Sequence, residues 1–400
     1  MLRRLLLALL PLLWLLVQSS PALAVEGDRA GPAPVDPTRV VAMQLEGLDT
    51  SAVERFLAEV SRSWEGYGPE ISLWDFLEVY RGEEDGKYSL RSILQGLGRY
   101  LVREILANAG LLVTLVSMAV VAAILQNLQT AFAGEGSGKV AYWVVYMMLF
   151  GLAVTGFGLA VATARQAMET LNSFILAILP TLITVLISMG GVATAAIFQP
   201  LMVTLLSLSS NITATVVFPL AFLAAVLDIV SGLNENFRLT NLASLLRQAS
   251  LAVMGFISTV FLGVVAVKGA AGAVADGLTM KTAKFVAGSF VPVIGKTISD
   301  AAELIMGSSL LLKNGLGILG STVIFFIVIF PLIKILSLSW VYQIAAALVQ
   351  PAGAGEVAKL LTSMSRSLQT LFAAVGIVAL MFFISIAVIV GAANLSVMVR

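Results

Sequence analysis

A stretch of 58 residues without a charged side chain, from Thr170 to Leu227, is the feature that most limits how this chain can fold. A helix needs about 20 apolar residues to cross a bilayer, so a stretch of this length crosses at least twice. Within a membrane, helix interruptions are tolerated where neighbouring helices satisfy the freed carbonyl groups. We therefore expect this stretch to pack against other protein rather than to face lipid throughout. The interruptions are Pro180, Gly190, Gly191, Pro200, Asn211 and Pro219.

The composition of the whole chain supports a membrane protein. Of 400 residues, 59% are hydrophobic and 12% charged, outside the range of soluble domains. The absence of Cys and His removes thiolate chemistry, the commonest general base and the commonest metal ligand. No hydrolase elbow, phosphate loop or basic aromatic patch is present. We predict a protein that is not an enzyme, has no cofactor or metal site and does not bind nucleic acid.

The first 104 residues differ in charge from the remainder. Residues 1–24 combine Arg3 and Arg4, an apolar run and an Ala-Leu-Ala site, which is typical of a cleavable signal peptide. An uncleaved anchor is the alternative. Residues 25–104 hold nine Lys/Arg against fifteen Asp/Glu, net −6, whereas residues 105–400 hold thirteen against eight, net +5. This asymmetry predicts an exported acidic region followed by a transmembrane body with basic cytoplasmic loops.

The exported region 25–104 contains a small helical part, over residues 49–104. A capping pair, Ser51 with Glu54, precedes apolar residues at helical spacing. Further helices are predicted over 72–80 and from Ser89 onward. About 50 residues bury little core, so this region packs on a partner, on the membrane surface or on the transmembrane body, or it forms a self-contained cap.

The fold class predicted for residues 105–400 is an all-α, polytopic membrane protein with about eight spans, within a range of six to nine. Lys334, beside Pro331, marks either a tight turn or a kink in a long helix. With eight spans and an exported N-terminus, the lysines between 268 and 313 lie in the cytoplasm, as the positive-inside rule prefers. The predicted spans lie within 105–134, 140–164, 170–227 (two crossings), 248–267, 314–333, 335–355 and 367–399.

A polar, glycine- and lysine-rich segment at 268–303 stands out between the spans. One interpretation is two half-helices joined at a Gly/Pro break and dipping towards a pathway, with lysines that attract anions. The other is an amphipathic cytoplasmic linker whose lysines lie at the lipid headgroups. The candidate pathway or interfacial residues are Asp276, Lys281, Lys284, Gly288, Pro292, Lys296 and Asp300.

The chain as a whole resembles the stage III sporulation protein AE family of endospore-forming bacteria. The resemblance is carried by the signal peptide, the acidic exported segment, the charge-poor body and above all the run KGAAGAVADGLTMKTAKFVAGSFVPVIG at 268–295. It implies a multi-pass protein of the mother-cell membrane around the forespore. Its expected partners are the bilayer and other membrane proteins of the channel complex that links the two cells, with a homo-oligomer as an open possibility.

The resemblance implies a non-enzymatic component of a sporulation channel or export apparatus, with a permease-like role as one form. An independent secondary transporter of a small solute and a purely structural scaffold are the alternatives. No catalytic or ligand-binding residue carries over from the family.

The signal peptide can be tested directly. If the Ala-Leu-Ala site is cleaved after Ala24, N-terminal sequencing of the membrane-purified protein will begin at Val25, because signal peptidase removes the whole apolar run. A chain that begins at Met1 would establish the uncleaved anchor instead.

Overall fold

The structure is a computed structural model that describes residues 50–63, 90–131, 136–233, 239–290 and 294–398. The signal peptide, the predicted helix over 72–80 and Pro292 lie outside these residues. The described residues form helices: α3 (Ser51–Ser63), α5 (Leu90–Ala107), α6 (Ala109–Ala131), α7 (Gly136–Ser188), α8 (Val192–Ile212), the π-helix η2 (Thr213–Val217), α9 (Phe218–Leu233), α10 (Thr240–Phe290), α11 (Ile294–Val349), the short 3₁₀ helix η3 (Gln350–Ala352) and α12 (Gly355–Met398).

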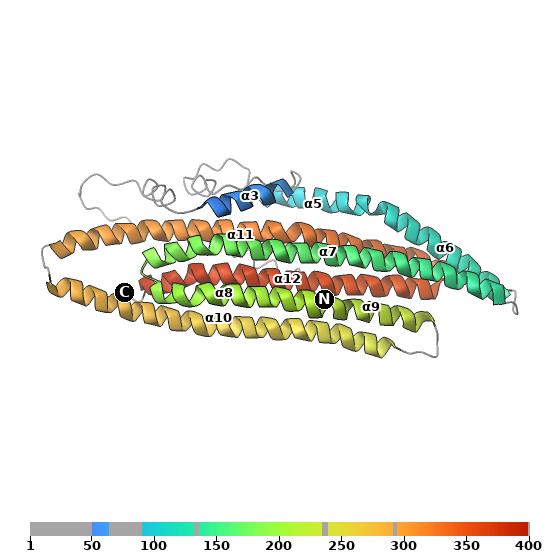
Figure 1. The fold of residues 1–400 in the computed structure, drawn as a ribbon. Coiled ribbons are helices and arrows are strands. Elements are labelled where there is room, and N and C mark those ends of the chain that lie inside the picture. The colour runs from blue at the N-terminus through green and yellow to red at the C-terminus, as the bar shows by residue number, and fades with distance from the viewer. Residues whose placement is uncertain (1–49, 64–89, 132–135, 234–238, 291–293, 399–400) are drawn as a thin grey trace.

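These helices form an elongated bundle in which long antiparallel helices lie side by side (Figure 1). The helix α11 packs on α12 and α7, and α10 packs on α8, α9 and α12. The turn between α11 and α12 lies at one end of the bundle, and α10 and α11 extend beyond the α7–α8 turn at the other end. This arrangement confirms the predicted all-α, polytopic class.

Six of the described helical segments are long and apolar enough to cross a membrane, at the lower end of the predicted range. The number is below eight because predicted boundaries fall inside continuous helices. Residues 140–164 and 170–188 belong to one helix, α7, which runs through Arg165 and Glu169. Likewise α11 runs through Pro331 and Lys334, so the long helix predicted as one alternative is the one observed. The segments are 109–127, 140–188, 192–231, 240–276, 309–352 and 355–391.

The chain reverses direction inside the charge-free stretch, at Gly190 and Gly191. Gly190 has φ 88°, a left-handed conformation that favours glycine. The N–H of Gly191 donates to the Leu186 carbonyl at 3.0 Å, which helps to satisfy the carbonyl groups at the end of α7. A Cβ at Gly191 would lie 2.7 Å from the Leu186 side chain. The turn therefore needs both glycines, one for its conformation and one for its space.

The prolines of this stretch lie within helices. Pro180 lies inside α7, where the Thr184 hydroxyl donates to the Pro180 carbonyl at 2.9 Å. Before Pro219 the chain widens into η2, and the Phe218 N–H donates to the Thr213 carbonyl five residues earlier. A π-type bulge is a common way to accommodate a disrupted helical hydrogen-bond pattern.

The described part of residues 25–104 packs on the long helices, one of the predicted alternatives. Phe56 of α3 lies against Phe174 of α7, with ring centroids 5.3 Å apart. Tyr100 of α5 meets Phe330 of α11 edge-on at 4.9 Å. Both helices lie along one side of the bundle (Figure 1).

The reversal yields a stability prediction. We expect Gly190→Ala to destabilise the protein by about 1–2 kcal/mol, because an L-residue in the left-handed region meets steric strain. A matched control is Gly158→Ala in α7, where an added Cβ meets nothing within 4 Å and alanine favours the helix. Thermal unfolding of both variants in detergent measures the difference, and equal transition temperatures would contradict the prediction.

Candidate functional site

The predicted segment 268–303 forms the adjoining ends of two long helices. Asp276 lies in α10 and is buried, with 1% of its surface exposed. Lys281, Lys284 and Gly288 follow on the same helix, which ends at Phe290. Lys296 and Asp300 lie in the first two turns of α11. The backbone therefore separates the candidates between two helices, and among them only Asp276 has a described side chain.

Asp276 caps a helix that is remote from it in sequence. Its carboxylate accepts hydrogen bonds from the backbone N–H groups of Ala193, at 2.8 Å, and Thr194, at 3.2 Å. These groups belong to the first turn of α8, whose own N-cap residue, Gly191, supplies no side-chain hydrogen bond. The first N–H groups of a helix have no partner inside it, and its positive end favours an anion. The arrangement ties α10 to the α7–α8 reversal.

Close approach of α10 to α8 makes this capping possible. Gly272 lies one helical turn before Asp276, and a Cβ added there would lie 2.7 Å from the Thr194 hydroxyl oxygen. A larger residue would push the helices apart and lengthen the carboxylate contacts. Asp276 therefore has a structural task in this fold, and its burial alone does not make it a pathway residue.

A second polar centre lies near the opposite end of the bundle. Asp228 of α9 accepts a hydrogen bond from Nη2 of Arg247, in α10, at 2.8 Å. The Ser363 hydroxyl of α12 donates to the same carboxylate oxygen at 2.7 Å. The two charged side chains are 12% and 17% exposed. Three helices thus meet at an ion pair within the bundle; we call Asp228, Arg247 and Ser363 the polar centre.

The polar centre adjoins a line of hydroxyl groups between α11 and α12. Nη2 of Arg247 lies 3.5 Å from the Ser367 hydroxyl, at the limit of a hydrogen bond. Further along, the hydroxyls of Ser339 and Ser365 lie 3.0 Å apart, both fully buried. The Nε atom of Arg247 is buried without a hydrogen-bond partner among the described residues. This centre therefore combines a guanidinium that retains donor capacity with hydroxyls that both donate and accept.

Sequence reasoning missed the polar centre. No sequence pattern paired Asp228 with Arg247. The two residues lie on consecutive antiparallel helices on either side of a short connection, and this spacing is the signal that could have suggested contact. In the described part of the chain, no group of three or more Asp or Glu residues could hold a metal ion.

Comparison with known proteins identifies the family. The sequence model described as stage III sporulation protein AE matches residues 71–393. This chain belongs to that family. A curated relative, stage III sporulation protein AE of Bacillus subtilis (strain 168), is 42% identical over 353 residues, which cover 88% of both chains. No solved structure matches the chain.

The polar centre of this stage III sporulation protein AE family member yields a stability prediction. We expect Arg247→Met to destabilise the protein by about 3 kcal/mol, because it leaves the Asp228 carboxylate buried without its counter-ion. The double variant Asp228→Leu/Arg247→Met removes both charges and should recover most of that loss. Unfolding in detergent measures both.

A matched control for this pair is Arg366→Met, in which an exposed arginine of α12 is changed. We expect an effect within about 0.5 kcal/mol. If the double variant were as unstable as Arg247→Met alone, the paired charges would not account for the stability.

Proposed function

We propose that this chain is a membrane component of a channel or export apparatus that links mother cell and forespore, and that it forms the permease-like part of that apparatus. Membership of the stage III sporulation protein AE family gives it a role in sporulation. In this proposal it resides in the mother-cell membrane with an extracytoplasmic N-terminal region, acts with other membrane proteins of the complex and catalyses no reaction.

The observation that supports the permease-like role is the polar centre. Ionisable groups inside a membrane bundle are expensive, and they commonly mark a substrate or ion pathway. Here the Asp228–Arg247 pair is joined by Ser363 and leads to the buried hydroxyls between α11 and α12. A pure scaffold could join the same helices with apolar contacts, because a well-packed apolar replacement for a buried ion pair is often as stable.

The decisive experiment separates function from stability. A sporulating strain would carry Asp228→Leu/Arg247→Met as its only copy, with the membrane level of the protein verified. We expect a strong loss of heat-resistant spores, because the fold keeps its packing while the polar centre loses its charges. Normal spore formation at a normal protein level would favour the scaffold and contradict the permease-like role.

Two further strains complete this experiment. Neutralising Lys281 and Lys284 tests the lysine-rich ends of α10 and α11 in the same assay, and a loss there would place the pathway at that end of the bundle. A deletion strain sets the lower limit for spore formation. An independent transporter is distinguished by solute flux in vesicles that contain the purified protein without partners.

A further inference from the structure

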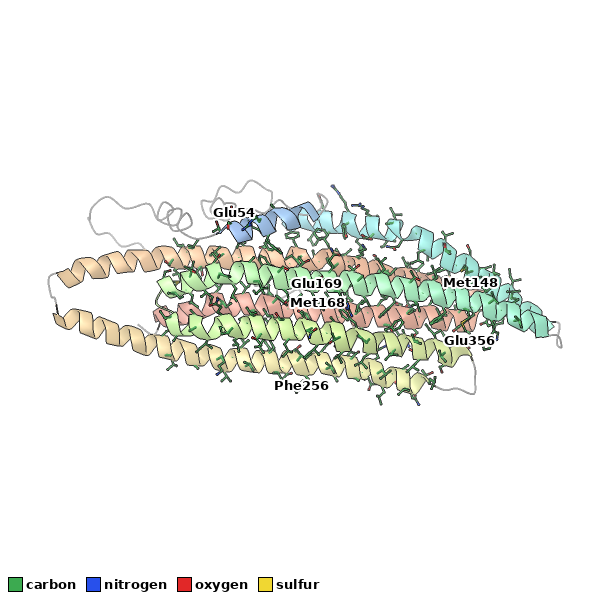
Figure 2. All side chains as sticks on the ribbon, viewed as in Figure 1. Glu54, Met148, Met168, Glu169, Phe256 and Glu356 are labelled. Atoms are coloured by element: carbon green, nitrogen blue, oxygen red, sulfur yellow. The ribbon has the colours of Figure 1, made fainter. Side chains whose placement is uncertain are left out.

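Arg165 is an exposed cation in the middle of α7, within a segment of 49 residues that is long and apolar enough to cross a membrane. Glu169, one turn further along α7, is also exposed and lies midway along the bundle (Figure 2). Ionic groups in such segments are costly and commonly have a function. The Nη2 atom of Arg165 donates a hydrogen bond to the Ala214 carbonyl of η2 at 3.1 Å, and this partner indicates what the function is.

The Ala214 carbonyl needs a donor from outside its own helix because of Pro219. In η2 the hydrogen bonds span five residues, and the Phe218 N–H donates to the Thr213 carbonyl. The next donor in this pattern, for the Ala214 carbonyl, would be residue 219, and proline has no N–H. A carbonyl without a donor costs free energy where water is scarce. The Arg165 guanidinium takes the place of the missing N–H.

The π-helix η2 inserts an extra residue between α8 and α9, and the burial pattern depends on it. In a regular α-helix a step of four residues overshoots a full turn by about 40°, so five such steps turn a stripe of residues by about 200°. The wide turn of η2 takes back about 100°, because it holds one more residue. This allows α8 and α9 to bury one side against α10 and α12. The buried residues at steps of four are Ser209, Thr213, Val217, Ala221, Ala225 and Ile229.

Contacts with α10 fix the rotation of α8 before this junction. Asp276 accepts hydrogen bonds from the first turn of α8, and Gly272 lies against Thr194 there. At the other end of α8, the hydroxyl of Thr213 lies 3.3 Å from Sδ of Met254 in α10. Since α8 is held at both ends, the number of residues in the turn of η2 determines how α9 is rotated.

The polar centre depends on that rotation. Asp228 of α9 meets Arg247 and Ser363, and beside it the Tyr146 hydroxyl donates to the Ile229 carbonyl at 3.2 Å. Without the extra residue, α9 would turn by about 100° relative to α8, and each of its residues would take the place of the next one in sequence. Residue 227, an uncharged leucine, would then lie where the Asp228 carboxylate lies now, and the ion pair would be lost.

We propose that Arg165 and Pro219 are positioning residues of the polar centre. Pro219 favours the π form of η2, Arg165 caps the carbonyl that this form leaves free, and the extra residue turns Asp228 towards its partners. The inference deepens the proposed function, and it rests on that function only for the use that the protein makes of the polar centre. It also gives the arginine of α7 a task inside an apolar segment.

Thiol reactivity on α9 tests this assignment, because loss of the extra residue would exchange exposed and buried positions. The chain has no Cys, so single cysteines can report on the full-length protein in detergent. Leu223 is 48% exposed, and after the rotation it would take the place of Ala224, which is fully buried. Ile229 is 2% exposed, and it would take the place of Val230, which is 38% exposed.

The comparison is between Pro219→Ala, which supplies an N–H at residue 219, and the double variant Arg165→Met/Pro219→Ala. With Pro219→Ala alone, we expect N-ethylmaleimide to react with Leu223→Cys and not with Ile229→Cys, because Arg165 still holds the Ala214 carbonyl. Addition of Arg165→Met lets the helix close regularly. It should lower the reaction rate several-fold at residue 223 and raise it several-fold at residue 229.

The matched control is Glu169→Gln/Pro219→Ala, which removes the other exposed charge of this part of α7. It should react as Pro219→Ala does. Unchanged reactivity in Arg165→Met/Pro219→Ala would overturn the proposal, because packing alone would then set the rotation of α9. A complete shift in Pro219→Ala alone would overturn the role assigned to Arg165.

Faster reaction at both residues in the double variant would also contradict the proposal, since general loosening exposes both thiols and only a rotation protects residue 223. The measurement uses purified protein alone. Its failure therefore leaves the sporulation assays of the proposed function intact, and failure of those assays would leave the reactivity pattern intact.

Discussion

The structure depends on satisfying the backbone where α8 begins. The reversal at Gly190 and Gly191 leaves the first N–H groups of α8 without intrahelical partners, in a stretch with no charged residue nearby in sequence. Asp276 supplies the missing acceptor from α10 at 2.8 and 3.2 Å. One carboxylate thus fixes the α7–α8 hairpin against the second hairpin, α10–α11. The helix α11 packs in turn on α12 and α7, so this contact is linked through α11 to the other long helices.

The polar centre likewise links helices through polar side chains, at the end of the bundle nearer the α11–α12 turn. Asp228 and Arg247 join α9 to α10, and Ser363 brings in α12. Between these two polar contacts the bundle is held by close packing of small residues, such as Gly320 against Ile386 and Gly272 against Thr194. Membrane helices associate through such close approach, because lipid offers no hydrophobic driving force between them. Directional polar contacts near both ends and small residues between them leave little freedom for one helix to slide along another.

Features that depend on hydropathy were predicted from the sequence, whereas contacts between helices distant in sequence were not. The helical class and the need for a reversal somewhere within the charge-free stretch follow from hydropathy, but the position of the reversal at Gly190 and Gly191 was not predicted. The continuity of α7 through Arg165 and Glu169 was not predicted, because these two charges were taken to mark the ends of separate spans. In the structure the Arg165 guanidinium donates a hydrogen bond to the Ala214 carbonyl of η2 at 3.1 Å. The roles of Asp276 and Asp228 depend on helices distant in sequence, which one sequence without its homologues does not reveal. For the region that contains α3 and α5, the sequence left four alternatives: packing on a partner, on the membrane surface or on the transmembrane body, or a self-contained cap.

The position of the membrane along so long a bundle is set by charge more than by hydropathy. Near the α11–α12 turn, Lys359 and Arg366 of α12 are exposed, with 72% of the Lys359 side chain accessible, and Glu356 is half-buried beside Lys359, so this end suits water. Hydropathy alone makes six described segments long and apolar enough to cross a membrane, and part of α6 is one of them. From the start of α7 the chain runs along the bundle three times, through α7, through α8 and α9, and through α10, so the start of α7 and the lysine-rich ends of α10 and α11 lie at opposite ends of the bundle (Figure 1).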